Sequence, residues 1–170
     1  VPGLSPLSFS PAAVEKLKTR TTPIQSWFLD QTLVMGYWGN ATGAKRSYHH
    51  TAPVNALYAL HESLRLLADE GLENAWARHA AMHQRLRAGL ERLGLSYIPK
   101  RSLHSLNCIR VPEGADDAGV RKRLLEEYGI EIGAGLGPMA GKAWRIGLMG
   151  HGATVRNVDL VLAALKAVLT

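Results

Sequence analysis

Cysteine is almost missing from this 170-residue sequence, since Cys108 is its only one. A lone cysteine excludes a disulfide framework within the chain and fits a reducing compartment, so we expect a cytoplasmic protein. No apolar run approaches the ~20 residues that a membrane-spanning helix needs. The N-terminus also has no charged region followed by an apolar core. We therefore expect no membrane partner.

Clusters of like charge are also missing. The formal net charge is +6, but Lys and Arg are spread from Lys16 to Lys166, and the aromatic residues do not interleave with them. A nucleic-acid-binding domain would gather its basic residues on one face or tail, so we expect no nucleic-acid partner. Apolar residues make up 46% and charged residues 20% of the chain, which is ordinary for a globular protein.

The N-terminal segment combines a strand pattern with a helix pattern. Residues 4–10 alternate apolar and small polar side chains, as a half-buried strand does. An isolated strand at a chain end has nothing to pair with. Ser10 is placed as the N-cap, and Pro11 as the first residue, of a short helix to about Lys18. This arrangement is typical of the end of a domain, so we expect the chain to be a fragment.

Residues 19–45 are loop-like, with one apolar segment among them. Residues 26–38 predict a short amphipathic helix, and residues 39–45 predict a turn-rich connector. The large aromatic side chains of this region form either a local core or an exposed surface that needs another subunit or a missing domain. The strand without a partner favours the second interpretation. These side chains are Trp27, Phe28, Tyr37 and Trp38.

Two long amphipathic helices follow, at about residues 53–71 and 71–94. Thr51 is placed as the N-cap of the first helix, with Pro53 in its first turn. The stretch before it reads RSYHHTAPVN, residues 46–55. Backbone N–H groups at a helix start favour an anion. The hydroxyls of Tyr48 and Thr51 beside such groups suit a phosphate better than a metal ion.

The histidines do not match a metal site. His49 and His50 are adjacent, so on a regular element their side chains point apart. His79 and His83 have the i,i+4 spacing of zinc ligands, but Ala80 stands where a zinc protease has glutamate, and no third ligand is evident. We expect His79 and His83 to lie on the surface of the second long helix.

The rest of the chain has an α/β rhythm. Strands are predicted at residues 95–99, 105–112, 130–135 and 143–150, and helices at residues 116–129 and 155–169. Thr154 is the expected N-cap of the last helix. Strand, strand, helix, strand, strand, helix makes a two-layer domain with helices covering one face of the sheet.

A glycine-rich loop precedes the last strand. Its Gly141–Lys142 pair is not followed by the Ser or Thr of a phosphate-binding loop. Gly135, Gly137 and Ala140 match a dinucleotide-binding pattern only loosely, because a strand and not a helix follows. Arg145 then stands between Trp144 and Ile146. It is either a charge on the solvent face of the sheet or a forked donor for a substrate carboxylate.

Three segments, in order and spacing, resemble the C-terminal half of alanine–glyoxylate aminotransferases, which are class V, fold-type I enzymes that use pyridoxal phosphate (PLP). They are YHHTAPVNALYALHESL, GLENAWARHAAMHQRL and IEIGAGLGPMAGKAWRIGLMG, and the resemblance covers nearly the whole chain. It implies an α/β fold in which residues 1–70 are a remnant of the large PLP-binding domain. Residues 71–170 would be a small C-terminal α/β domain with a mostly antiparallel sheet.

The same resemblance implies the roles of individual residues. Tyr48 and Thr51 would contact the PLP phosphate of the neighbouring subunit in a homodimer. Arg145 would bind the carboxylate of the amino-acid or keto-acid substrate, and Gly135 and Gly137 would let the chain pass close to the substrate pocket. His49 and His50 have no assigned chemistry and would pack at the subunit interface.

The implied activity moves an amino group from alanine or serine to glyoxylate or pyruvate. The catalytic lysine should lie a few residues before Val1, in the missing N-terminal large domain, because Lys16, Lys18 and Lys142 do not fit its place. The chain alone is therefore expected to be inactive and not to hold PLP firmly. Alternatives are a non-catalytic self-association module and a desulfurase, the latter disfavoured because Cys108 falls on a predicted buried strand.

Overall fold

The computed structural model describes residues 3–38 and 46–170, which form two compact units. Unit 1 is Val1–Leu66 and unit 2 is Leu67–Thr170. The predicted connector at residues 39–45 lies outside the described residues. Over the described part of the chain, no helix has both the length and the apolar character needed to cross a membrane.

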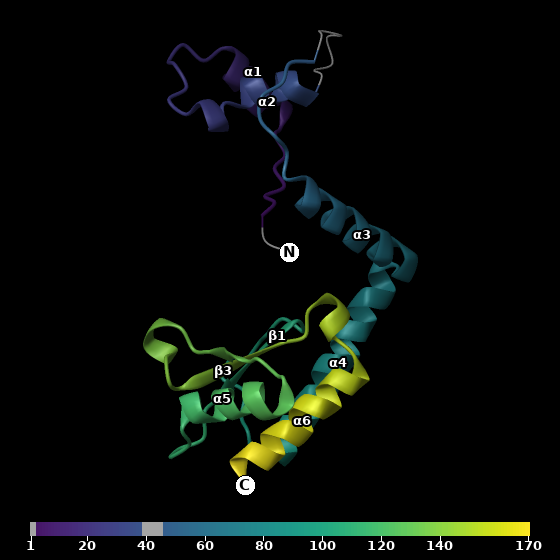
Figure 1. Cartoon of the computed structure of the whole chain (residues 1–170), viewed down its shortest axis with the longest axis vertical. Coiled ribbons are helices and arrows are strands. Elements are labelled where there is room, and N and C mark those ends of the chain that lie inside the picture. Colours follow the sequence, from purple (N-terminus) through teal and green to yellow (C-terminus); the bar gives the residue numbers. More distant parts are fainter. Residues whose placement is uncertain (1–2, 39–45) are drawn as a thin grey trace. The chain divides into compact units, whose positions relative to one another are not determined.

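Unit 1 consists of helices and irregular segments (Figure 1). Helix α1, Pro11–Lys18, begins as predicted, because the Ser10 side chain accepts a hydrogen bond from the Ala13 amide at 3.2 Å. Residues 4–10 form no strand and most of them are exposed, so that prediction was wrong. An alternating pattern needs a neighbouring strand to pair with, and the described residues of unit 1 supply none.

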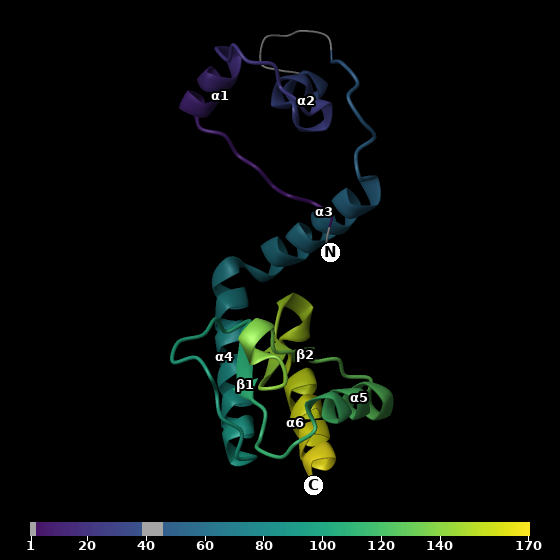
Figure 2. The same cartoon turned by 90° about the vertical axis from the view of Figure 1, so that its left-hand side faces the viewer.

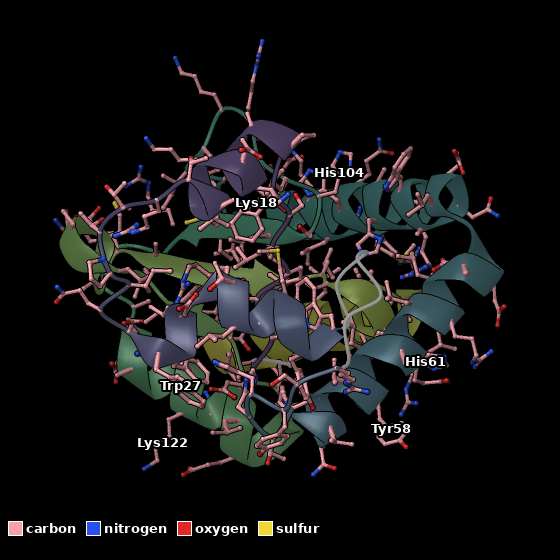
Figure 3. All side chains as sticks on the ribbon, turned by 90° about the horizontal axis from the view of Figure 1, so that it is seen from above. Lys18, Trp27, Tyr58, His61, His104 and Lys122 are labelled. Carbon is pink, nitrogen blue, oxygen red and sulfur yellow. The ribbon has the colours of Figure 1, made fainter. Side chains whose placement is uncertain are left out.

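The helix predicted at residues 26–38 is divided in two. A 3₁₀ turn, η1, spans Trp27–Leu29, and helix α2 spans Gln31–Trp38. Asp30 separates them, since its carboxylate accepts hydrogen bonds from the Thr32 amide at 2.9 Å and the Thr32 hydroxyl at 2.6 Å. Helix α3, Val54–Glu70, follows the irregular segment 46–53 and has no buried residue. Tyr58 and His61 project from α3 in Figure 3.

Unit 2 is a three-stranded antiparallel sheet with helices packed on one face. Its elements are α4 (Leu72–Arg92), β1 (Leu106–Arg110), α5 (Asp117–Tyr128), β2 (Gly133–Ala134), η2 (Gly137–Met139), β3 (Ala143–Gly147), η3 (Gly150–Gly152) and α6 (Val155–Leu169). The strand order is β1-β3-β2. Helix α6 contacts both α4 and α5 (Figures 1 and 2). The predicted two-layer α/β architecture is confirmed.

The strand predicted at residues 95–99 is reduced to a single bridge between Tyr97 and Ile109. Two backbone hydrogen bonds flank the bridge, from the Ile98 amide to Cys108 at 3.0 Å and from the Arg110 amide to Ser96 at 2.8 Å. The segment therefore pairs with β1 only over the width of one bridge.

The core of unit 2 lies between the sheet and its helices. Trp144 and Ile146 of β3 and Ile109 of β1 point into it, because alternate residues of a strand face the same side. Helices α4, α5 and α6 contribute Leu86, Leu90, Val120, Leu124, Val158 and Leu165, all buried. Thr154 caps α6 as predicted, by accepting a hydrogen bond from the Asn157 amide at 3.2 Å.

Candidate functional site

The candidate phosphate-binding residues meet in unit 1. The Tyr48 hydroxyl lies 3.0 Å from the Thr51 hydroxyl, and both residues are exposed. The rings of Tyr48 and of Tyr37 of α2 are nearly perpendicular, with centroids 6.0 Å apart. Arg46 lies over the Tyr37 ring and donates a hydrogen bond to the Tyr37 carbonyl at 2.7 Å. These contacts tie the segment 46–51 to α2 and leave two hydroxyl groups side by side at the surface.

Thr51 is not the N-cap of α3, which corrects the prediction. The helix begins at Val54, and the Leu57 amide donates to the Pro53 carbonyl at 3.0 Å. The cap position therefore falls on Pro53, two residues later than expected, and the Thr51 hydroxyl contacts Tyr48 instead. Two adjacent hydroxyls can both donate to one anionic oxygen, so the pair still fits a phosphate group.

His49 and His50 turn toward each other, contrary to the expectation that they point apart. Their Nδ1 atoms are 2.6 Å apart, which the irregular backbone at this point allows. His49 is buried, stacks on Trp27 with centroids 4.1 Å apart, and places Nε2 3.1 Å from the Trp27 carbonyl oxygen. Because a carbonyl oxygen only accepts, His49 Nε2 is the donor in the contact with Trp27. The two histidines thus organise the interior of unit 1.

The candidate carboxylate-binding residue, Arg145, belongs to unit 2. Arg145 stands in the middle of β3, paired with Cys108 on one side and Gly133 on the other. Its neighbours Trp144 and Ile146 face the helices, so strand alternation places Arg145 on the open face of the sheet. The side chain is half-buried.

The Arg145 guanidinium is held against β2. Its Nε donates a hydrogen bond to the Ala134 carbonyl at 2.7 Å. Within residues 3–38 and 46–170, its Nη1 and Nη2 atoms have no hydrogen-bond or ion-pair partner. A carboxylate can engage a guanidinium through two parallel hydrogen bonds. With Nε already used, the pair that stays available is Nη1 and Nη2.

Trp144 anchors the strand that carries Arg145. Its ring is completely buried, and its Nε1 donates to Asp117 Oδ1 of α5 at 2.8 Å. Arg121, one turn along α5, donates to the same oxygen at 2.9 Å. The hydrogen bond from Arg121, together with that from Trp144, holds the pKa of Asp117 below its ordinary value of 3.8. This carboxylate connects β3 to α5. It thereby fixes the position of the strand that carries Arg145.

The glycine-rich loop before β3 has local reasons for its glycines. A Cβ atom at position 135 would lie 1.9 Å from the Met139 carbonyl oxygen, so only glycine fits there. Gly137 begins η2 with φ +54°, a conformation that favours glycine. Both residues shape the turn itself. Their expected closeness to a substrate pocket stays a prediction.

The remaining candidates do not form a metal site, and the surface positions predicted for His79 and His83 were wrong. His83 is buried, with Nδ1 2.6 Å from Asn107 Oδ1. His79 is half-buried, and its Nε2 accepts a hydrogen bond from the Gly150 amide at 3.0 Å. His83 therefore faces β1 and His79 faces η3, on the side of α4 that contributes buried residues to the core. Among the described residues, no group of three or more His, Cys, Asp or Glu side chains could hold a metal ion.

Sequence reasoning missed the partners of Arg145. Gly133 and the Ala134 carbonyl contact the guanidinium only because β2 pairs with β3 in one particular register. The segment IEIGAG predicted a strand, but its residues do not indicate which other strand it pairs with. Cys108, the other neighbour of Arg145 in register, lies on β1 as predicted and is half-buried.

A model of the family described as aminotransferase class-V matches residues 10–159. The chain is 44% identical over 171 residues to the alanine–glyoxylate aminotransferase of Callithrix jacchus, a match that covers 99% of this chain and 41% of that protein. It is 41% identical over 149 residues to the (S)-ureidoglycine–glyoxylate transaminase of Bacillus subtilis (strain 168), covering 86% of this chain and 35% of that protein.

Solved structures agree with these relatives. The crystal structure of an alanine–glyoxylate aminotransferase from Nostoc sp. matches with a TM-score of 0.87 and 45% identity, over 96% of this chain and 43% of that one. The chain therefore spans well under half the length of the relatives that it matches. Since the family model covers most of the sequence, this chain belongs to the class V aminotransferase family.

Proposed function

We propose that this chain is the C-terminal part of a longer, cytoplasmic aminotransferase that uses PLP and moves the amino group of alanine or serine to glyoxylate or pyruvate. The names of its relatives support glyoxylate as an acceptor, with alanine or (S)-ureidoglycine as the donor. Alanine, serine and both acceptors share one feature, a carboxylate next to the reacting carbon. The proposed reaction needs a residue that binds this carboxylate, and we propose that this part of the protein provides it.

The half-buried guanidinium of Arg145 carries the proposal. Its Nε is fixed to the Ala134 carbonyl at 2.7 Å, which leaves Nη1 and Nη2 as a fork of matching geometry for a carboxylate. Two parallel charge-assisted bonds orient the substrate as well as bind it. Such orientation lowers the entropy cost of reaching the reactive geometry.

Tyr48 and Thr51 would hold the cofactor. Their hydroxyls, 3.0 Å apart at the surface of unit 1, are a suitable donor pair for the phosphate of PLP bound to the other subunit of a homodimer. When bound, PLP supplies an electron sink for chemistry at the substrate's α-carbon. The catalytic lysine would come from the large domain outside this chain, so we propose that the chain is inactive by itself.

The Arg145→Lys variant of the longer protein tests this function. Lysine keeps the charge but cannot reproduce two parallel hydrogen bonds. A charge-assisted hydrogen bond contributes roughly 1.5–3 kcal/mol, so kcat/KM for the amino acid should fall about 10- to 100-fold. The measurement is steady-state transamination with alanine and serine as donors and glyoxylate and pyruvate as acceptors. Unchanged kinetics in a folded variant would return Arg145 to the role of a solvated charge on the sheet.

The alternative is a non-catalytic module that associates with itself. It is favoured by the exposed aromatic side chains of η1 and α2, since Trp27, Phe28 and Trp38 are 57%, 59% and 67% exposed. Analytical ultracentrifugation of the 170-residue chain separates the two ideas. Concentration-dependent association of this chain, together with a lack of transaminase activity in the longer protein, would favour the module.

A further inference from the structure

Gly133 is an unexpected residue at its position in β2. Glycine weakens a strand because it has no side chain to pack and gains backbone freedom on unfolding. Its backbone does not need glycine either, since Gly133 is not among the glycines with positive φ. What glycine provides here must therefore be space.

The space at position 133 is filled by the Arg145 guanidinium. A Cβ atom on residue 133 would lie 3.1 Å from Arg145 Nη2 and 3.3 Å from both Cζ and Nε. Three atoms of the guanidinium at nearly equal distances from one point mean that the group lies flat over the bare backbone of Gly133. The hydrogen bond from Nε to the next carbonyl, Ala134, fixes the rotation of the group in its own plane.

Gly135, two residues later, shows the contrast. There a Cβ atom would meet the Met139 backbone at 1.9 Å, so the glycine serves the chain turn. At position 133 the nearest atoms all belong to a single side chain, that of Arg145. A methyl group at 133 would therefore displace the guanidinium and leave the backbone of the sheet in place.

We propose that Gly133 is a positioning residue: its missing side chain seats the Arg145 guanidinium flat on β2, with Nη1 and Nη2 aimed at the substrate carboxylate. The inference rests on the proposed function of Arg145. It adds that the size of residue 133 determines how well Nη1 and Nη2 of Arg145 are aligned with the substrate carboxylate. The distances at position 133 require a shift of a few tenths of an ångström for alanine, and valine would demand more.

Small displacements of this kind matter because paired hydrogen bonds are directional and weaken as their angle worsens. We expect Gly133→Ala to raise KM for the amino donor and for the keto acid about threefold to tenfold, with kcat changed less. Gly133→Val should raise KM further. Valine is a strong strand former, so a loss of function in that variant would not come from a weaker strand.

Gly147→Ala is the matched control. It adds the same methyl group to the same face of the sheet, two residues from Arg145, and its nearest neighbour would be Met149 Cε at 3.9 Å. We expect its kinetics and melting temperature to stay at the wild-type values. A general sensitivity of the sheet to added methyl groups would appear in this control as well as in Gly133→Ala.

A double-mutant cycle with Arg145→Ala in the longer protein gives the decisive result. If Gly133 acts through Arg145, Gly133→Ala has no further effect once the guanidinium is gone. Calorimetric binding of the keto acid to the same four proteins provides a readout independent of turnover, and a melting curve checks that each is folded. Equal, additive effects in both backgrounds would overturn the proposal, as would wild-type KM values in a folded Gly133→Val.

Different results would contradict the proposed function of Arg145 and the positioning role of Gly133. If Arg145→Ala leaves binding of the keto acid unchanged, the proposed function of Arg145 is wrong, and the positioning role of Gly133 falls with it. If Arg145→Ala weakens binding but both Gly133 variants bind as the wild type does, only the positioning role is wrong.

Discussion

Asp117 joins two elements through one carboxylate. Arg121 of α5 donates to it at 2.9 Å and the buried indole of Trp144 at 2.8 Å. Asp117→Ala would leave the indole N–H of Trp144 without this acceptor. A buried donor left unpaired costs about 1–3 kcal/mol, which is the loss of unfolding free energy that we expect at pH 7. Urea unfolding of the 170-residue chain measures it.

Asp117→Asn separates charge from hydrogen bonding. Its amide oxygen can still accept from Trp144, but it lacks the negative charge that the hydrogen bonds from Arg121 and Trp144 stabilise, which is why the pKa of Asp117 lies below 3.8. A depressed pKa in the folded state means that the unfolded state binds more protons. The stabilisation is therefore complete above the ordinary pKa and is lost as pH falls through the lower folded value. The stability difference between wild type and Asp117→Asn should shrink below about pH 4. A difference that is constant from pH 7 to pH 3 would contradict this assignment.

At the scale of elements, Arg78 connects three segments of unit 2. Its Nη1 donates to the carbonyls of Gly150, the first residue of η3, at 2.8 Å and of Ala153, the residue after η3, at 3.1 Å. Its Nε and Nη2 donate to Glu70, the last residue of α3. The guanidinium of Arg78 thus holds the loop after β3 onto the helices, and it lowers the pKa of Glu70 chiefly through this hydrogen bond.

Arg78→Met keeps most of the aliphatic stem and removes all of these donors. We expect faster amide hydrogen exchange at Gly152 and Ala153 and a rise in the pKa of Glu70, both measured by NMR on the 170-residue chain. Arg87→Met on the same helix is the control, because within the described part of the chain the ion pair of Arg87 is an exposed i,i+4 bridge to Glu91 at 2.9 Å, and its guanidinium stacks on Tyr97. Loop exchange that is no faster in Arg78→Met than in Arg87→Met would show that the loop is held by other contacts.

The elements also show what the sequence could predict. Helices α1, α4, α5 and α6 were predictable because a helix's hydrogen bonds and caps are local, as Ser10 and Thr154 illustrate. Strands depend on a distant partner, so residues 4–10 form none and residues 95–99 form only a bridge.

Side-chain partners were the least predictable feature of the candidate site. The sequence left Arg145 as either a charge on the solvent face or a donor for a carboxylate. The structure places it half-buried, on the face opposite to Trp144 and Ile146, as the period of a strand requires. Its seat on Gly133 depends on strand register, which follows from the packing of the whole sheet. In the same way, the spacing of His79 and His83 gave no indication that one binds a loop amide and the other Asn107.

At the scale of the whole molecule, the two units differ in how much they bury. The large core cluster lies in residues 86–168 of unit 2, whereas among the described residues of unit 1 only Val34 and His49 are buried. A unit with so small an interior has little hydrophobic stabilisation of its own. Together with the exposed aromatic side chains of η1 and α2, this leads us to propose that unit 1 is covered in the longer protein by the large domain and a second subunit.

The proposed homodimer makes a specific prediction for Tyr48. In the longer protein, Tyr48→Phe removes one hydrogen bond to an anionic phosphate, which should weaken PLP binding about tenfold without changing KM for the amino acid. Tyr58→Phe is the control, since Tyr58 on α3 is 73% exposed and its hydroxyl has no hydrogen-bond partner within the described ranges.

Dilution provides the second half of the test. Because Tyr48 and Thr51 would reach the cofactor of the other subunit, conditions that separate the dimer should release PLP as well, and earlier in Tyr48→Phe than in Tyr58→Phe. Gel filtration at falling protein concentration, with PLP absorbance and molar mass recorded on the same peak, follows both events. Full PLP occupancy on a peak with the mass of one subunit would mean that this pair of hydroxyls does not reach across a dimer. Their 3.0 Å contact would then serve only to order the segment before α3.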